Sequence, residues 1–197
     1  MHFCEQSINT TFKVIILMTK INLNGTELEI IVKDIIETSF DVIVIPTNPR
    51  LLPSGTLRCK VLRKAGTKVQ IECNKIINRV SKIPVGGAVM TSGGDLKAKY
   101  IIHTAGPRLG QGNEGKKLAL CTLNSLKLAD DKGLSSIAFN PISIENLGFN
   151  AKICAEIMLP TIKKYITEKN KNLKKIGIYL TEKPELQEFE KVLKNIN

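Results

Sequence analysis

The amino-acid sequence predicts an α/β protein, a three-layer α/β/α sandwich. Two observations predict it. Short apolar runs typical of buried strands alternate with longer segments whose apolar residues recur at helical spacing, and breaks that contain glycine or proline separate the two kinds of segment. Strands that alternate with helices form a sheet covered by helices on both faces.

The first two predicted strands lie in residues 28–32 and 41–45. The first is a β-branched run that follows an Asn24-Gly25 turn signal. The second is almost continuously apolar and is stopped by Pro46. Because such a run suits a strand that is buried on both faces, residues 41–45 are expected at the centre of the sheet.

The later elements follow the same alternation. A long helical pattern covers residues 57–77, although Gly66 interrupts it, and Gly133 is suited to end a later helix. Further strands are expected at residues 86–91, 100–105, 136–139 and 176–180, and further helices at 116–132, 151–168 and from 184 to the C-terminus. Loops at residues 46–56 and 140–150 follow strands, where ligands of such folds bind.

Length and composition limit the classes of protein. The 197 residues suit one domain, expected at residues 19–197 after an extension at 1–18. The apolar run at residues 14–18 is too short for a membrane span or a signal peptide. The five cysteines are odd in number and contain no CxxC pair, which argues against a zinc site or a disulfide framework. We therefore expect a cytoplasmic protein.

The net charge of +11 points to anionic partners. Much of it lies in residues 60–82 and 163–175. Either these stretches are solvated helix faces, or they form a functional basic patch that binds RNA, poly(A) or another acidic polymer. Aromatic residues make up only 5% of the chain, so stacking platforms for single-stranded nucleic acid are scarce.

The motifs of common catalytic sites are absent from the sequence. It has no complete Walker A motif and no GxSxG. The two histidines are His2 and His103, which excludes a metal triad of histidines. His103 lies in a predicted strand, and we expect it to be packed there. No metal and no cofactor are expected.

Three pairs of segments resemble the macro domain family, especially the macro domain of a variant core histone. They are IPTN at 45–48 with LRKAGTK at 62–68, GGAV at 86–89 with KAKYIIH at 97–103, and LKLADDKGLSSIAF at 126–139 with GF at 148–149. The resemblance implies that the central sheet is mixed and that the ligand is ADP-ribose or a related nucleotide, free or on an ADP-ribosylated protein.

The resemblance assigns the two ends of the expected ligand. Asp34, followed by Ile35, stands where the family has an acidic residue that accepts a hydrogen bond from the adenine amino group. Asn48 stands where the family's asparagine contacts the distal ribose. The alternatives are an exposed turn aspartate at Asp34 and an Asn-Pro turn formed by Asn48 and Pro49.

The first ligand loop of the family is rich in glycine, and the matching stretch keeps only Gly55, with Leu57 following. Glycines let backbone amides approach phosphate and ribose. Arg58 stands where ADP-ribosyl hydrolases of the family have their acidic catalytic residue. Because a guanidinium stays protonated, it does not serve as a general base, which argues against hydrolysis by that route.

The second ligand loop resembles the family's phosphate cradle, and the resemblance implies contacts from residues 143–149. These residues are Ser143, Ile144, Glu145, Asn146, Leu147, Gly148 and Phe149. Phe149 is expected either against the ligand's ribose or base, or in the core at the entry of the next helix. Glu145 replaces the central glycine, and its carboxylate repels a pyrophosphate unless it turns to solvent or pairs with Arg50 or Arg58.

Three functions follow from these residues. The first is a binding module for ADP-ribose or a related nucleotide with an atypical phosphate loop. The second is a macro domain whose pocket is lost or repurposed, and which binds RNA, another acidic polymer or a protein through its basic surface. The third is an ADP-ribosyl hydrolase or deacylase, which the resemblance supports and Arg58 opposes.

Overall fold

A computed structural model of the chain describes residues 17–196. The strands are β1 (Met18–Leu23), β2 (Thr26–Val32), β3 (Val42–Thr47), β4 (Ala88–Ser92), β5 (Tyr100–Ala105), β6 (Ser136–Phe139) and β7 (Lys175–Leu180). The helices are α1 (Thr56–Ala65), α2 (Thr67–Val80), α3 (Glu114–Asp131), α4 (Ile144–Leu147), α5 (Ala151–Glu168) and α6 (Lys183–Ile196), with a 3-10 turn η1 (Ile35–Glu37). β5, β6 and α5 have the bounds that the sequence predicts.

The strands form one seven-stranded mixed sheet of order β1-β2-β7-β6-β3-β5-β4. The central strands β2, β7, β6, β3 and β5 are parallel, whereas β1 and β4 pair antiparallel at the two sides. The parallel strands therefore all end at one edge of the sheet, the carboxyl edge, and all begin at the opposite amino edge. Ligands of open α/β sheets bind at the carboxyl edge.

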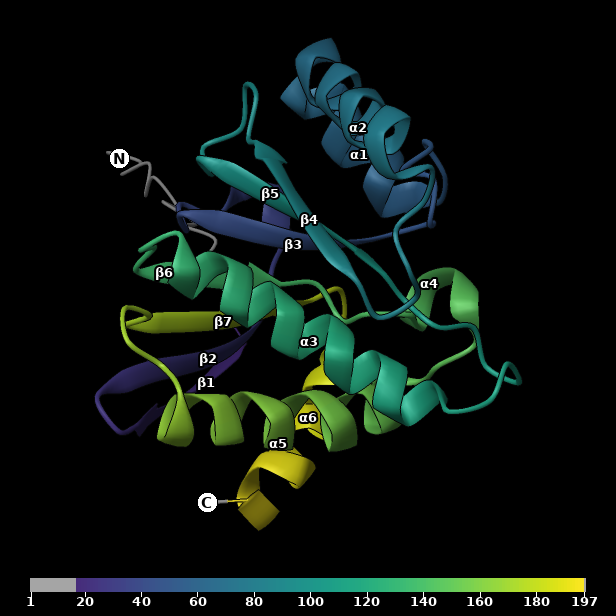
Figure 1. Cartoon of the computed structure of the whole chain (residues 1–197). Coiled ribbons are helices and arrows are strands. Elements are labelled where there is room, and N and C mark those ends of the chain that lie inside the picture. The colour runs from purple at the N-terminus through teal and green to yellow at the C-terminus, as the bar shows by residue number, and fades with distance from the viewer. Residues whose placement is uncertain (1–16, 197) are drawn as a thin grey trace, which may run out of the picture.

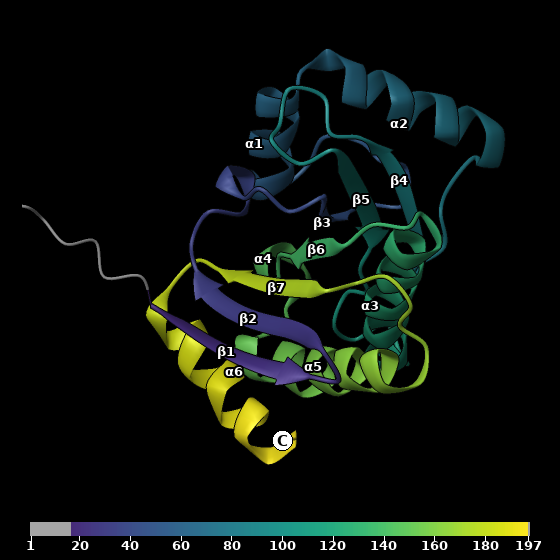
Figure 2. The same ribbon diagram turned by 90° about the vertical axis from the view of Figure 1, so that its left-hand side faces the viewer.

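Helices cover both faces of the sheet, which confirms the three-layer fold. α1 and α2 lie on one face and α3, α5 and α6 on the other (Figures 1 and 2). β3 shows why the sheet is buried between them. Val42 and Val44 join one apolar cluster, Ile43 and Ile45 join the other, and each is at most 1% exposed. Burial on both faces explains the apolar run in the sequence.

β1 is the strand that the sequence analysis missed. Residues 18–23 alternate exposed and half-buried side chains, and Lys20 and Asn22 are on the exposed side. Such an edge strand needs few apolar residues, because one face stays in solvent. A turn with positive φ at Asn24 and Gly25 joins β1 to β2. Residues 1–16 of the expected extension lie outside the described residues, and β1 begins at Met18.

Two other expectations are refined by the structure. The helical pattern of residues 57–77 is divided into α1 and α2 at Gly66, whose φ of 81° is a conformation that glycine adopts readily. The expected loop at residues 140–150 contains the short helix α4. Both differences arise from local backbone geometry, which the apolar pattern alone does not specify.

Candidate functional site

Two neighbouring cavities open at the carboxyl edge of the sheet. The Asn48 cavity has a volume of about 470 Å³ and the Asp34 cavity about 500 Å³. The Asn48 cavity is lined by Pro46, Thr47, Asn48, Pro49, Ser54, Gly55, Leu57, Arg58, Val85, Gly106, Arg108, Gln111, Ser143 and Leu147. The Asp34 cavity is lined by Val32, Lys33, Asp34, Ile35, Thr56, Leu57, Lys60, Asn140, Pro141, Ile144, Leu180, Thr181 and Glu185. Leu57 lines both, so the cavities meet there.

Asp34 stands directly after β2 and begins the 3-10 turn η1. Its Oδ1 accepts the backbone amide of Ile36 at 3.1 Å, and its Oδ2 accepts from Lys60 Nζ at 2.5 Å. Partial burial alone would raise the pKa of Asp34, but the hydrogen bonds from Lys60 and from the Ile36 amide outweigh it and lower the pKa. The carboxylate is therefore charged near neutral pH and serves as an acceptor at the wall of its cavity.

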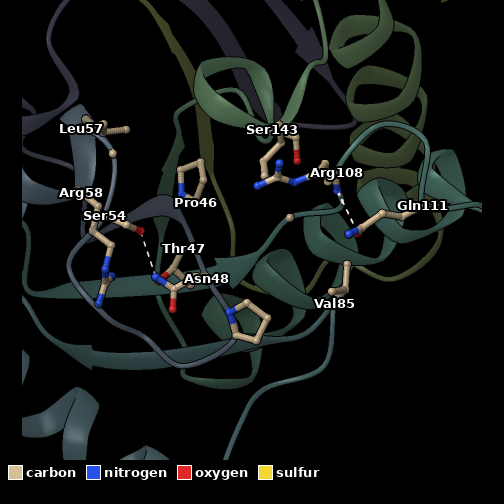
Figure 3. Close-up of a pocket in the computed structure, with 14 residues that line it drawn as sticks. Pro46, Thr47, Asn48, Ser54, Leu57, Arg58, Val85, Arg108, Gln111 and Ser143 are labelled. Carbon is tan, nitrogen blue, oxygen red and sulfur yellow. Dashed lines mark hydrogen bonds between the residues drawn. The ribbon is translucent and has the colours of Figure 1, made fainter.

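Asn48 follows β3 and organises the loop between β3 and α1. Its Oδ1 accepts the amides of Arg50 and Leu52, both at 3.1 Å. Its Nδ2 donates to the Leu52 carbonyl at 2.9 Å. It also donates to Ser54 Oγ at 2.9 Å (Figure 3). The expected turn at Asn48 is therefore present, and the residue also lines the cavity. These four hydrogen bonds use both donors and both lone pairs of the half-buried carboxamide, so it is preorganised at the cavity wall, and a ligand hydroxyl binds it by replacing a partner such as the exposed Ser54.

Arg58 lies beneath this loop and is only 2% exposed. Its Nε donates to the Leu52 carbonyl at 3.0 Å and its Nη2 to the Leu51 carbonyl at 2.6 Å. Its Nη1 lies 2.8 Å from His103 Nδ1. Burial lowers the pKa of Arg58, yet an arginine remains protonated in proteins. The side chain thus supports the loop and offers no base to the cavity.

His103 is a packed strand histidine, as predicted, with no exposed surface. Because Arg58 only donates, His103 Nδ1 must accept, which places the ring proton on Nε2. Nε2 then donates to Thr91 Oγ1 at 2.8 Å, and the Thr91 hydroxyl donates to the Ser92 carbonyl at 3.1 Å. Burial first, and then the charge of Arg58, hold the pKa of His103 well below its ordinary value.

The second loop, residues 143–149, closes the site from the other side. Ser143 has a φ of 73°, a conformation that favours glycine, and its side chain lines the Asn48 cavity. A Cβ at Gly106 would lie 2.4 Å from Ser143 Oγ, so glycine is required there for the loop to approach the end of β5. The Leu109 amide also donates to the Leu147 carbonyl at 2.8 Å, which joins the loop after β5 to the second loop.

Two buried hydroxyls of the Asn48 cavity have no hydrogen-bond partner within the described part of the chain. They are Thr47 Oγ1 and Ser143 Oγ, on residues that are 8% and 2% exposed. Buried polar atoms are nearly always hydrogen-bonded in native proteins, since leaving one unpaired is costly. Two such atoms in one cavity indicate a place where a ligand with hydroxyl or phosphate oxygens completes the hydrogen bonding.

The structure brings most of the expected site residues together. Eight of the residues expected from the sequence line the two cavities: Asp34, Ile35, Asn48, Gly55, Leu57, Ser143, Ile144 and Leu147. Gly148 lines neither cavity, and Phe149 is 5% exposed in the core, the alternative placement for this aromatic residue. The side chains of Glu145 and Asn146 lie outside the described residues.

Sequence reasoning missed the residues supplied by β5 and β7. Arg108 and Gln111, on the loop after β5, line the Asn48 cavity together with Ser143 (Figure 3). Thr181 and Glu185, after β7, line the Asp34 cavity. The signal available for them was position: each follows a parallel strand, whose end lies at the carboxyl edge.

Metal and membrane sites are not found in residues 17–196. No group of three or more histidine, cysteine, aspartate and glutamate side chains is placed to hold a metal ion. No helix in this range is long and apolar enough to cross a bilayer. The cysteines described, Cys59, Cys73, Cys121 and Cys154, are free, and the last three are buried.

Comparisons with known proteins agree with this architecture. The chain matches the model of the macro domain family over residues 44–158. It is 39% identical to a macro domain-containing protein of Listeria monocytogenes over 85% of this chain and 97% of that protein. It is 36% identical to the O-acetyl-ADP-ribose deacetylase of Escherichia coli K12 over 72% of this chain and 81% of the enzyme.

Solved structures give the same answer for the fold. The macrodomain of Oceanobacillus iheyensis with ADP superposes with a TM-score of 0.88 at 31% identity, over 92% of this chain and 97% of that one. The family model spans both cavity loops, residues 46–56 and 143–149. The chain therefore belongs to the macro domain family.

Proposed function

We propose that this macro domain binds ADP-ribose or a related nucleotide across the two cavities. The observation that carries the proposal is their arrangement. A carboxylate acceptor, Asp34, lines one cavity, a preorganised carboxamide, Asn48, lines the other, and the cavities meet at Leu57. An elongated ligand with adenosine at Asp34 and its second ribose at Asn48 places its pyrophosphate between the two loops. The solved macrodomain with ADP, at 31% identity, supports an adenine nucleotide as the class of ligand.

The cavities also supply suitable chemistry for each part of the ligand. An ionised carboxylate only accepts, which suits the adenine amino group. The hydroxyls of Thr47 and Ser143 would gain partners from ribose or phosphate oxygens. Gly55 begins α1 with a φ of 71°, and the positive end of this ten-residue helix faces an anion favourably.

Isothermal titration of the purified protein with ADP-ribose at moderate salt tests the proposal. We expect micromolar binding that is weakened about tenfold or more by Asp34→Ala, because the adenine loses a charged acceptor. Asp131→Ala is the matched control, since Asp131 is an exposed aspartate on α3 that lines neither cavity. Absence of heat from a folded protein would refute the proposal.

Deacylation is a second candidate, favoured by the relatives that are named O-acetyl-ADP-ribose deacetylase. Arg58 stands at the position of the expected catalytic acid, and none of the described side chains that line the Asn48 cavity is a carboxylate. We therefore expect binding of O-acetyl-ADP-ribose without turnover by a carboxylate base. Release of acetate that Asn48→Ala abolishes would instead establish the enzyme.

Binding of an acidic polymer is a third candidate, favoured by the exposed basic face of α1 and α2. Its members are Lys60, Arg63, Lys64, Lys68, Lys75 and Arg79, whereas Glu72 is the acidic residue of these helices. Such binding to poly(A) must weaken steeply with salt, because neutralised phosphates release counterions. Binding that is absent, or insensitive to salt, removes this candidate.

A further inference from the structure

The buried guanidinium of Arg58 is held only by neutral acceptors within the described residues. The carbonyls of Leu51 and Leu52 and the Nδ1 of His103 take its Nη2, Nε and Nη1 donors. A cation with 2% exposure and no carboxylate partner is costly to bury. Within the described residues these hydrogen bonds, together with a contact of 3.7 Å from Nη2 to Cys73 Sγ, offset that cost and fix the position of the guanidinium.

Arg58 and Asn48 hold the same peptide from two sides. The Leu52 carbonyl accepts from Arg58 Nε at 3.0 Å and from Asn48 Nδ2 at 2.9 Å. The Leu52 amide in turn donates to Asn48 Oδ1 at 3.1 Å. A shift of the Leu52 peptide would therefore move both ends of the Asn48 carboxamide, so Arg58 and Asn48 are coupled through this single residue.

Leu51 has an unfavourable backbone conformation, which the surrounding contacts maintain. It has a φ of 56°, which a bulky side chain rarely adopts, and it is fully buried. Its carbonyl accepts from Arg58 Nη2 at 2.6 Å and from Gln70 Nε2 at 3.2 Å. A strained backbone persists only where its surroundings over-determine it, and Arg58 supplies the shorter of these two contacts.

His103 holds the Arg58 guanidinium from the sheet, by a hydrogen bond on β5. Its Nδ1 accepts from Arg58, its Nε2 donates to Thr91, and the ring has no exposed surface. The resulting chain of hydrogen bonds runs in one direction, from Arg58 through His103 and Thr91 to the Ser92 carbonyl. Arg58 is thereby anchored to β4 and β5, and the loop is anchored to Arg58.

We propose that Arg58 is a positioning residue that aligns the Asn48 carboxamide for the second ribose of the ligand. The inference rests on the proposed function, since Asn48 contacts that ribose only if the nucleotide binds as described. By the resemblance, Arg58 stands where ADP-ribosyl hydrolases of the family have their acidic catalytic residue. Arg58 thus acts on affinity for ADP-ribose and has no effect on ligands that lack the second ribose.

Titration of the full chain with ADP-ribose and with ADP tests the proposal, because ADP lacks the second ribose. Arg58→Met is expected to lower affinity for ADP-ribose about tenfold or more and to leave affinity for ADP unchanged. Arg58→Lys, which keeps the charge, is expected to show the same selective loss, because one ammonium does not span the acceptors that the guanidinium fork bridges. Arg63→Met, an exposed arginine on the same helix, is the matched control.

The possible results distinguish a failure of the positioning role of Arg58 from a failure of the proposed nucleotide binding. Equal losses for ADP and ADP-ribose, or wild-type affinity for ADP-ribose in both Arg58 variants, would overturn the positioning role. If the wild-type protein binds neither nucleotide, the proposed function fails, and the ligand part of this inference fails with it.

Hydrogen exchange on the unliganded protein tests the positioning part without a ligand. The amides of Arg50 and Leu52 are held by Asn48 Oδ1, so Arg58→Lys is expected to raise their exchange rates, whereas Arg63→Met leaves them unchanged. Unaltered exchange at both amides would show that Asn48 keeps its place without Arg58.

Discussion

The two edges of the sheet differ in how fully their polar groups are hydrogen-bonded within the described residues. At the amino edge, carboxylates are surrounded by donors from the chain itself. At the carboxyl edge, Thr47 and Ser143 keep buried hydroxyls without partners, and Arg58 keeps a charge without a counter-ion among the described residues. We infer that the polar groups of the amino edge stabilise the fold, whereas the unpaired hydroxyls of the carboxyl edge are positioned to hydrogen-bond with a ligand.

Asp41 and Asp130 define the amino edge. Asp41, before β3, accepts the amides and hydroxyls of Ser135 and Ser136 and the ammonium of Lys99, at 2.7 to 3.1 Å. It thereby joins the starts of β3 and β6. Burial alone would raise its pKa, but the hydrogen bonds from Lys99 and from the two serines lower it strongly.

Asp130 makes a similar junction between α3 and the segment before β7. Its carboxylate accepts from Tyr165 Oη at 2.7 Å and from the amides of Lys171 and Asn172 at 3.1 and 2.8 Å. The residue is 4% exposed. Here too burial would raise the pKa of Asp130, and the hydrogen bonds outweigh it and lower the pKa.

The largest expected effect is on stability at the amino edge. Asp130→Ala leaves the buried Tyr165 hydroxyl and two partly buried backbone amides without their acceptor, and it is expected to lower the free energy of unfolding by about 2–4 kcal/mol. Chemical denaturation measures it, with the exposed neighbour Asp131→Ala as control. Affinity for ADP-ribose should not change in either variant. A loss below about 0.5 kcal/mol, the range of ordinary surface substitutions, would show that Asp130 does not stabilise the amino edge.

The pH dependence of stability tests the buried histidine of the carboxyl-edge network. The folded state lowers the pKa of His103, so unfolding takes up a proton below the unfolded pKa of about 6.5. Stability is therefore full above that pH and falls as the pH falls, by about 1–2 kcal/mol between pH 7 and 5. His103→Asn, which keeps an acceptor for Arg58, should remove most of this slope. An unchanged slope would contradict the assignment.

Sequence reasoning predicted most of the fold because the buried strands have distinctive patterns. β3, β5, β6 and β7 appear as apolar runs, since both of their faces are covered. β1 was missed because polar residues, Lys20 and Asn22 among them, interrupt its apolar residues. The site was predicted partly, through the resemblance. The Arg58–His103 contact, the unpaired hydroxyls and the cavity residues after β5 join positions far apart in sequence, which no local pattern encodes.

The next effect tests the altered phosphate loop. The resemblance predicts that Glu145 stands where the family's cradle has a glycine, and a carboxylate about 4 Å from a phosphate charge costs about 1 kcal/mol in water-like surroundings. Glu145→Gly is therefore expected to raise affinity for ADP-ribose about fivefold, and Glu145→Gln by part of that amount. Titration at two salt concentrations should show the gain shrinking as salt rises. Equal affinities in all three proteins would mean that this carboxylate lies away from the pyrophosphate.

The smallest expected effect is the most direct test of the unpaired hydroxyls. Thr47→Val removes a buried oxygen that has no partner, so the free energy of unfolding should stay within about 0.5 kcal/mol or rise, whereas ADP-ribose should bind several-fold more weakly. Thr104→Val is the matched control: its hydroxyl donates to the Gly87 carbonyl at 3.0 Å, so its loss should cost about 1 kcal/mol of stability. If both valine substitutions destabilise the protein equally, the Thr47 hydroxyl already has a hydrogen-bond partner. The buried polar groups of the carboxyl edge would then be hydrogen-bonded as fully as those of the amino edge.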